Sequence, residues 1–177
     1  MSKVRTLSRT FMSTHPRKGQ DTHFVEKVLT SLGIDYTSHD YFILLLSLNP
    51  KLSEIQIHNF YQSLSINVLP KHHTIRGGNH FAQGDKISLR VWSAKPYNSK
   101  QIIIAPDIEV KKVWIFEVTP LDGIQMPQVK ATTTVADIAK NDGLELRDFY
   151  DWFQIKGHKC KKPFVGQVIC WSDQIEY

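Results

Sequence analysis

A run of reactive side chains, Lys71-His72-His73-Thr74-Ile75-Arg76, brings an amine, a hydroxyl and a guanidinium together in one short segment. The three groups suit a nucleotide or an acyl group as ligand. A threonine hydroxyl becomes a good nucleophile only when a base takes its proton, and a lysine can be that base only if its pKa falls well below about 10.4. Burial and the charge of Arg76 would both lower the pKa of Lys71.

The same run is predicted to form a β-strand over residues 72–76. Pro70 favours an extended conformation before it and cannot donate a hydrogen bond to a sheet, and the two glycines after Arg76 end the strand. Because side chains alternate between the faces of a strand, Thr74 and Arg76 are expected to share a face. Lys71 has the wrong parity to join them, so it must lie in the turn before the strand, or on a bulge, if it is to meet Thr74.

A lysine-rich loop follows the next predicted strand and offers aromatic rings on which a base could stack. Tyr97 is expected to be exposed, with Lys95 and Lys100 on either side, and Trp92 stands where the strand ends. Trp114 has the same chemistry, but its alternating apolar neighbours favour a place in the core. The predicted nucleotide-binding set is therefore Lys71, Thr74, Arg76, Trp92, Lys95, Tyr97 and Lys100.

Helices are predicted in the first part of the chain, and short strands in most of the remainder. Thr22 is expected to cap the first helix and Gly33 to end it, and Phe24, Val28 and Leu32 form an apolar face that needs a partner surface. The predicted helices span residues 21–33, 40–48, 53–64, 135–141 and 145–153. The predicted strands span residues 72–76, 86–93, 100–105, 108–119 and 164–171.

The composition is that of a globular protein with a basic balance. With 41% hydrophobic and 22% charged residues, long disordered regions are not expected. The most apolar run, residues 41–48, is too short to span a membrane, and the amino terminus lacks the apolar core of a secretory signal, so a cytoplasmic protein is predicted. A net charge of +5 and a pI near 9.2 favour a polyanionic partner.

The basic residues concentrate in two segments, residues 1–20 and 156–162, which contain no acid. They predict one basic face, although a solvated tail and loop would show the same pattern. His15 lies in the first segment, which would either fold over the cleft or remain an ordinary flexible terminus.

The histidines do not predict a metal site. His72 and His73 are adjacent, so they would point to opposite faces of a strand, and neither has a nearby cysteine or a regularly spaced carboxylate. No metal and no cofactor are expected.

One segment contains Lys71, Thr74 and Arg76, followed by the Gly84-Asp85 turn and strand-like residues. This segment resembles the signature of the ASCH domain, a small module of the PUA-like β-barrel class. Residues 139–149 are similar to the helical segment of that family which carries an acidic residue into the cleft. The two matches cover roughly residues 68 to 171. The resemblance implies an α+β fold, with a PUA-like barrel of about five to six strands and flanking helices over residues 67–177. Residues 1–66 would be a helical extension packed on the barrel.

The resemblance also implies a cleft that binds RNA or a modified nucleoside. Small bacterial members that hydrolyse acetylcytidine have a proposed catalytic lysine, threonine and carboxylate, which correspond here to Lys71, Thr74 and Asp142. The family enzymes carry the longer glutamate at the third position, and an ionised Asp142 beside Lys71 would stabilise the ammonium form rather than the free amine.

Three functional hypotheses follow. The leading prediction is binding of RNA, a nucleotide or a nucleoside through a basic cleft, without catalysis. The first alternative is an amidohydrolase that deacylates an acylated nucleoside such as acetylcytidine. The second is an adaptor that recruits a still unknown protein partner through the apolar face of the N-terminal helices.

Overall fold

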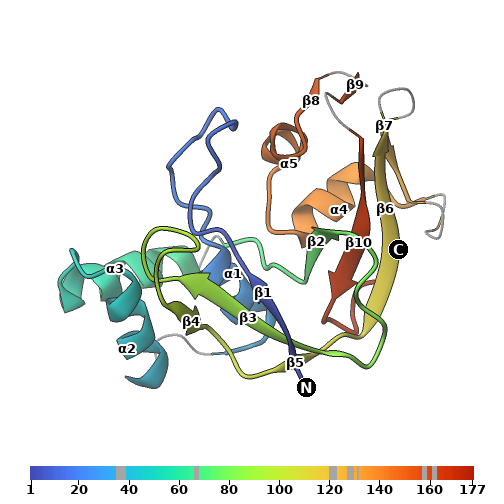
Figure 1. Ribbon diagram of the computed structural model, residues 1–177. Coiled ribbons are helices and arrows are strands. Elements are labelled where there is room, and N and C mark those ends of the chain that lie inside the picture. The colour runs from blue at the N-terminus through green and yellow to red at the C-terminus, as the bar shows by residue number, and fades with distance from the viewer. Residues whose placement is uncertain are drawn as a thin grey trace.

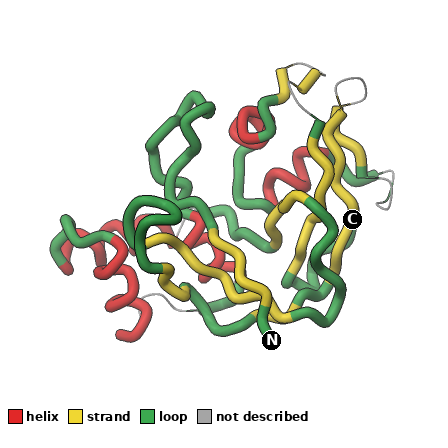
Figure 2. Tube along the Cα trace, viewed as in Figure 1, coloured by secondary structure: helices red, strands yellow, loops and turns green. Residues whose placement is uncertain are grey.

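A computed structural model describes the protein over residues 1–34, 39–65, 68–119, 123–126, 130, 132–156, 159–160 and 163–177. The architecture is mixed α+β, with helices beside two four-stranded sheets (Figure 1). Figure 2 distinguishes these helices and strands from the loops that connect them. Within the described ranges, no helix is long and apolar enough to cross a membrane.

The first sheet contains β1 (Lys3–Thr6), β3 (Lys86–Trp92), β4 (Gln101–Ile103) and β5 (Ile108–Glu109). β3 is central, since β1 pairs with it in parallel and β4 and β5 pair with it antiparallel. Alternate residues of β3 (Ile87, Leu89 and Val91) are fully buried, as expected for one face of a strand on a core. The sequence analysis placed residues 3–6 in a helical extension and did not predict β1.

The second sheet contains β2 (His73–Gly77), β6 (Lys112–Thr119), β7 (Gly123–Gln125) and β10 (Phe164–Cys170). Its order is β2-β10-β6-β7 and its neighbours are antiparallel. β10 requires a glycine beside β2, because a Cβ atom at Gly166 would lie 2.2 Å from the carbonyl oxygen of Arg76. A separate hairpin joins β8 (Ile155–Lys156) to β9 (Lys159–Cys160).

The strand predicted over residues 108–119 divides between the two sheets. β5 pairs with β3 and β6 pairs with β10, so the chain leaves one sheet and enters the other. The hydrogen bonds change partner at the crossing, where Val110 N donates to Asp85 O at 2.7 Å and Lys111 N donates to Cys170 O at 2.8 Å. Among the described residues no strand pairing joins the two sheets into a closed barrel, and the PUA-like barrel stays a prediction.

The helices are α1 (Phe24–Ser31), α2 (His39–Leu48), α3 (Glu54–Ser65), α4 (Val135–Asn141) and α5 (Leu146–Trp152). Both ends of each helix lie within three residues of the ends of a predicted helix. The prediction that Thr22 caps α1 is wrong: the N-cap is His23, with φ 56°, and Thr22 Oγ1 donates to Ser8 O at 2.7 Å. The segment that leads into α1 is therefore tied to the chain that follows β1.

α1 lies against the segments that flank the second sheet. Lys71 N donates to Lys27 O at 3.0 Å, and Trp171 Nε1 donates to Ser31 Oγ at 3.1 Å. α5 contacts that sheet through an edge-to-face pair of rings, Phe116 and Phe149, whose centroids are 6.1 Å apart. Helices from both ends of the chain thus surround the start of β2.

Candidate functional site

Lys71 lies just before β2, outside the strand. Its backbone nitrogen donates to Lys27 of α1, and the backbone nitrogen of His72 donates to Asn141 O at 2.8 Å, at the end of α4. The start of β2 is therefore held between α1 and α4. The Lys71 side chain is only 1% exposed, although lysine is among the residue types least often buried.

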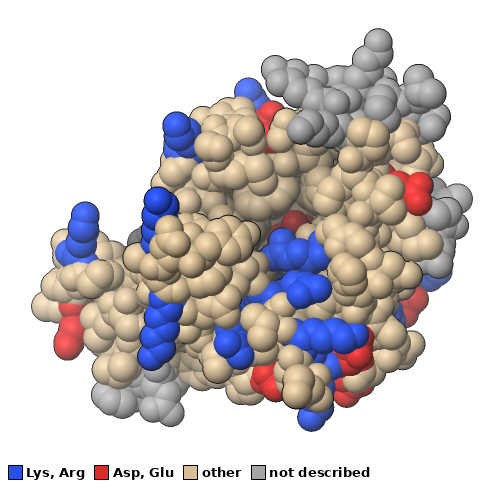
Figure 3. All heavy atoms as spheres, viewed as in Figure 1, with Lys and Arg blue, Asp and Glu red and all other residues tan. Residues whose placement is uncertain are grey.

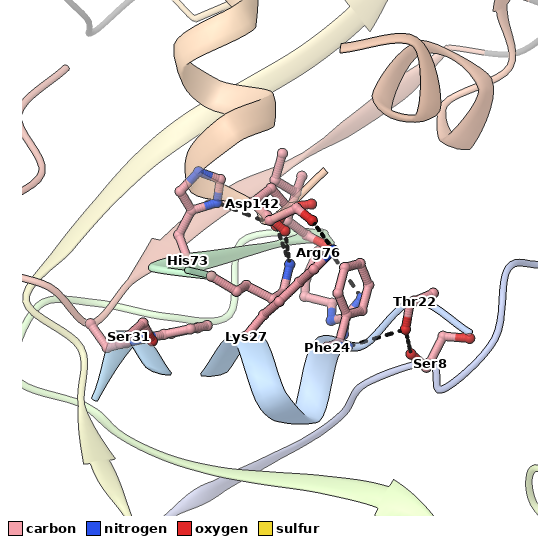
Figure 4. A network of polar contacts seen from close by, with 12 residues as sticks. Ser8, Thr22, Phe24, Lys27, Ser31, His73, Arg76 and Asp142 are labelled. Atoms are coloured by element: carbon pink, nitrogen blue, oxygen red, sulfur yellow. Dashed lines mark hydrogen bonds and ion pairs between the residues drawn. The ribbon is translucent and has the colours of Figure 1, made fainter. Parts of the chain in front are cut away.

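The Lys71 ammonium is paired with Asp142. Lys71 Nζ donates to Asp142 O at 2.7 Å and to the Asp142 carboxylate, and it lies 4.2 Å from the centre of the Phe24 ring. Asp142 is 5% exposed and forms the C-cap of α4, where the helix dipole favours a cation. Figure 4 shows His73, Arg76 and the Phe24 ring close to this carboxylate.

Burial and pairing have opposite effects on the pKa values of the two groups. Burial lowers the pKa of Lys71 to about 8, although the nearby Asp142 carboxylate acts to raise it. Burial raises the pKa of Asp142, but Lys71 and His73 together outweigh it and the pKa ends below its usual value. Around neutral pH the two groups are therefore mostly an ion pair.

Thr74 lies on β2 opposite Ile169 and is buried. Among the hydrogen bonds between described residues, none joins Lys71 Nζ to Thr74 Oγ1. Of the three predicted catalytic residues, the structure thus brings Lys71 and Asp142 together and leaves the Thr74 hydroxyl without a contact to the amine.

His73 belongs to this buried cluster, and the sequence analysis gave it no role. Its Nδ1 atom lies 3.5 Å from Asp142 Oδ1, and neither ring nitrogen has a hydrogen-bond partner among the described residues. Burial lowers the pKa of His73, which keeps the ring neutral. The signal for His73 in the sequence was its position next to Thr74 in the predicted strand. Which carboxylate the His73 ring faces depends on the tertiary structure.

Arg76 connects the two sheets. From β2 it reaches β1, where Arg76 Nη2 donates to Thr6 O at 2.7 Å. Burial lowers the pKa of Arg76, and Asp142 partly offsets that effect. The guanidinium stays charged, because arginine is not deprotonated in proteins.

A groove of about 680 Å³ lies beside this contact. Its lining includes residues from both sheets and from the loop after β3, among them Arg5, Thr6, Arg76, Trp92, Tyr97 and Gln101. No carboxylate lines it, and within the described part of the chain neither arginine has an ion-pair partner. In Figure 3, lysine and arginine side chains gather along the rim of a hollow on the face shown.

The aromatic residues of the groove are Trp92 and Tyr97, whose ring centroids are 5.4 Å apart. Tyr97 is 87% exposed, which confirms the expectation of an exposed ring, and it has φ 64°. Trp114 is buried, as its alternating neighbours indicated. The predicted set thus converges in part: Arg76, Trp92 and Tyr97 line one groove, whereas Lys71 and Thr74 are buried.

Lys95 and Lys100 are exposed on the loop between β3 and β4, and the groove lining includes neither. Arg5 lies in the groove, although the sequence analysis identified it only as a member of the basic N-terminal segment. The Arg5 guanidinium packs 4.7 Å from the centre of the Phe81 ring, and its Nη1 donates to Val4 O at 2.7 Å. Arg5 lies on β1, which pairs with β3 far along the sequence. The residues next to Arg5 in the sequence therefore could not predict its place in the groove.

The basic segment around His15 packs on α5. His15 is buried, its Nε2 lies 3.2 Å from Asp148 O, and Arg17 Nη1 donates to Asp148 Oδ2 at 2.5 Å. The His15 ring stacks on Phe11 with centroids 4.3 Å apart. These contacts hold the segment in place as a specific part of the fold.

Within the described residues, no group of three or more histidine, cysteine or acidic side chains is arranged to hold a metal ion. Comparisons of the chain with models of protein families, with curated proteins and with solved structures found no match.

Proposed function

We propose that the groove between the two sheets binds RNA, a nucleotide or a modified nucleoside without transforming it. The observation that carries the proposal is the combination of two guanidiniums and two aromatic rings around one open groove. Arg5 and Arg76 would hold a phosphate, which guanidinium binds through paired hydrogen bonds. Trp92 and Tyr97 would stack on a base, with Gln101 near its edge.

Deacylation has less support from the same geometry. Lys71 and Asp142 are buried as an ion pair, so a substrate in the groove would meet Arg76 and not the amine. An amidohydrolase would need that pair to open and the Lys71 amine to reach Thr74. We therefore assign the pair a structural role and the groove the binding role.

The adaptor hypothesis cannot use the surface that the sequence suggested for it. Phe24 and Val28 are buried, and Leu32 packs against the core. The core of the protein itself therefore provides the partner surface for this apolar face.

We also propose that the two sheets correspond to the parts of a PUA-like barrel of the ASCH type. The support is local: Lys71 lies just before β2, Thr74 and Arg76 lie within it, and the β5-to-β6 segment passes from one sheet to the other. An experimental structure would test this relationship through the closure of the strand pairings.

The binding proposal can be tested by measuring the affinity of the protein for single-stranded RNA at several salt concentrations. Arg76→Gln should weaken binding about tenfold, and it should reduce the slope of log affinity against log salt by about 0.7, since one phosphate contact is lost. Arg147→Gln, an exposed arginine on α5, is the matched control and should bind as the wild type does.

Because Arg76 also contacts Thr6, thermal unfolding of the variant must show that it is folded at the assay temperature. Arg5→Gln should weaken binding in the same way without breaking the link between the sheets. The proposal fails if folded Arg5→Gln and Arg76→Gln proteins both bind RNA as tightly as the wild type.

A further inference from the structure

The groove continues past Trp92 into a second hollow of about 270 Å³. The two hollows share four lining residues, Leu7, Ser8, Trp92 and Pro96. The second is completed by Arg9, Thr10, Asp21 and Ala94. Trp92 and the chain after β1 are therefore walls common to two adjoining spaces.

We infer that the ligand is a single-stranded nucleic acid that places neighbouring nucleotides in the two hollows, on either side of Trp92. This inference rests on the proposed function, because it assumes that the first groove binds a nucleotide. It selects a strand of at least two nucleotides over a free nucleoside.

The two hollows differ in charge in a way that suits a phosphate in one and a base in the other. Arg5 and Arg76 line the first, which has no carboxylate. The second contains the Asp21 carboxylate, which would repel a phosphate but can accept a hydrogen bond from an exocyclic amino group of a base.

Arg9 also lines the second hollow, and it shares that hollow with the Asp21 carboxylate. Arg9 Nη2 donates to Leu48 O at the end of α2 and to Asn49 Oδ1 at 3.1 Å. Ser8 Oγ likewise donates to Thr10 O at 2.5 Å. The second hollow therefore combines one arginine with one carboxylate beside Trp92, whereas the first has two arginines.

Trp92 is placed to contact both nucleotides. Trp92 is half-buried, and it lines both hollows. Tyr97 lies beside it on the side of the first groove only. Successive bases stacked on aromatic rings along a basic groove are the usual arrangement in proteins that bind single strands.

The test is calorimetric titration with 5′-phosphorylated oligoadenylates of one, two and four nucleotides. The dinucleotide should bind at least about fivefold more tightly than the mononucleotide, because a second base gains a stacking contact. Ala94→Leu adds bulk to the wall of the second hollow and should bring the ratio of the two affinities close to one. Asn98→Leu places the same leucine side chain on the same loop at a residue that lines neither hollow, so it should preserve the ratio.

The outcomes separate this inference from the function on which it rests. If the mononucleotide binds in a manner that requires Arg76 and Arg5, but the dinucleotide binds no more tightly, the two-nucleotide inference is overturned and the proposed function stands. An Ala94→Leu protein that keeps the full ratio would also overturn the inference. If no oligoadenylate binds in a manner that depends on the two arginines, the proposed function fails and the inference fails with it.

Discussion

At the scale of single residues, the Lys71–Asp142 pair combines two charges that would each be costly to bury alone. The ammonium has a carboxylate, a backbone carbonyl and the face of an aromatic ring around it. Removing one partner of a buried ion pair leaves an uncompensated charge, which usually costs more than the intact pair contributes. The stability of the β2–α4 junction should therefore depend on both side chains being present.

Asp142→Asn should lower the free energy of unfolding by about 3 to 5 kcal/mol, because the buried ammonium of Lys71 loses its counter-charge. Chemical denaturation measured by circular dichroism gives this value. Asp173→Asn, an exposed aspartate near the carboxyl end, is the control and should change stability by less than about 0.5 kcal/mol. A variant at position 142 as stable as the control would show that the pair is dispensable.

The same pair predicts a pH dependence. The pKa of Asp142 in the folded protein lies below its ordinary value of about 3.9, so the unfolded chain binds more protons in that range and stability rises with pH. This contribution is complete above the unfolded pKa and is lost as the pH falls through the folded pKa. The stability difference between the wild type and Asp142→Asn should therefore shrink below about pH 4. Unfolding curves of both proteins at several acidic pH values test this prediction. A stability difference that stayed constant over that range would contradict it.

Tyr97 has a left-handed backbone conformation that non-glycine residues seldom adopt, yet its ring is almost fully exposed. Backbone strain without a gain from burial points to a ligand-binding role for the ring. Tyr97→Asn should leave stability unchanged or raise it by up to about 1 kcal/mol, because asparagine tolerates this conformation.

The same variant should weaken RNA binding about 5- to 150-fold, the range expected for loss of one stacked base. Tyr97→Phe keeps the ring and should retain the affinity. Thermal unfolding and RNA titration of both variants would settle the point, and wild-type affinity in Tyr97→Asn would exclude the ring from the binding site.

At the scale of elements, the corner between α4 and α5 positions Asp142. Gly143 follows it with φ 73°, and Lys27 Nζ donates to Gly143 O at 2.6 Å. A Cβ atom at Gly143 would lie 3.1 Å from Lys27 Cδ and 3.2 Å from Lys71 Cβ. The corner therefore needs glycine for its backbone conformation and for the close approach of two lysine side chains.

Gly143→Ala should destabilise the protein more than Gly84→Ala does. Both glycines have positive φ, at 73° and 86°, but Gly84 has open space where the new methyl group would lie. Each variant should lose about 1 to 2 kcal/mol from backbone strain, and Gly143→Ala should lose about 1 kcal/mol more from crowding. Equal losses, measured by denaturant unfolding, would mean that the surrounding lysines adjust at no cost.

At the scale of the whole molecule, the N-terminal strand makes the groove possible. β1 pairs with β3 in the first sheet, and its Thr6 carbonyl accepts a hydrogen bond from Arg76 in the second. The segment after β1 continues to α5, where Arg17 pairs with Asp148. The first residues of the chain thus contact both sheets and a helix near the other end of the sequence.

Deletion of residues 1–6 should therefore reduce both stability and RNA binding. Loss of the β1 hydrogen bonds should cost about 2 to 4 kcal/mol, and binding should fall more than about tenfold because Arg76 loses its acceptor and the groove loses a wall. Thr6→Ala is the control: it keeps the backbone carbonyl and should behave almost as the wild type does. Wild-type binding by the folded deletion protein would show that β1 is not part of the site.

The sequence by itself determined the features that depend on neighbouring residues. Helical periodicity predicted α1 and α4 closely, and Gly33 was correctly expected to end α1. Alternation and flanking turns located β2 and β3, and the polar loop context of Tyr97 predicted its exposure. Each of these signals acts over a few residues, so no distant contact was needed to interpret it.

The tertiary structure alone decided which of these elements form the site. β1 has only four residues and becomes a strand through its pairing with β3, and the 108–119 segment divides because its two halves meet different sheets. The fold brought Lys71 and Asp142 together as an ion pair and left Arg5 and Arg76 to line the groove. Charge, burial and distance between residues far apart in sequence are properties of the folded chain, and for that reason no local pattern could predict them.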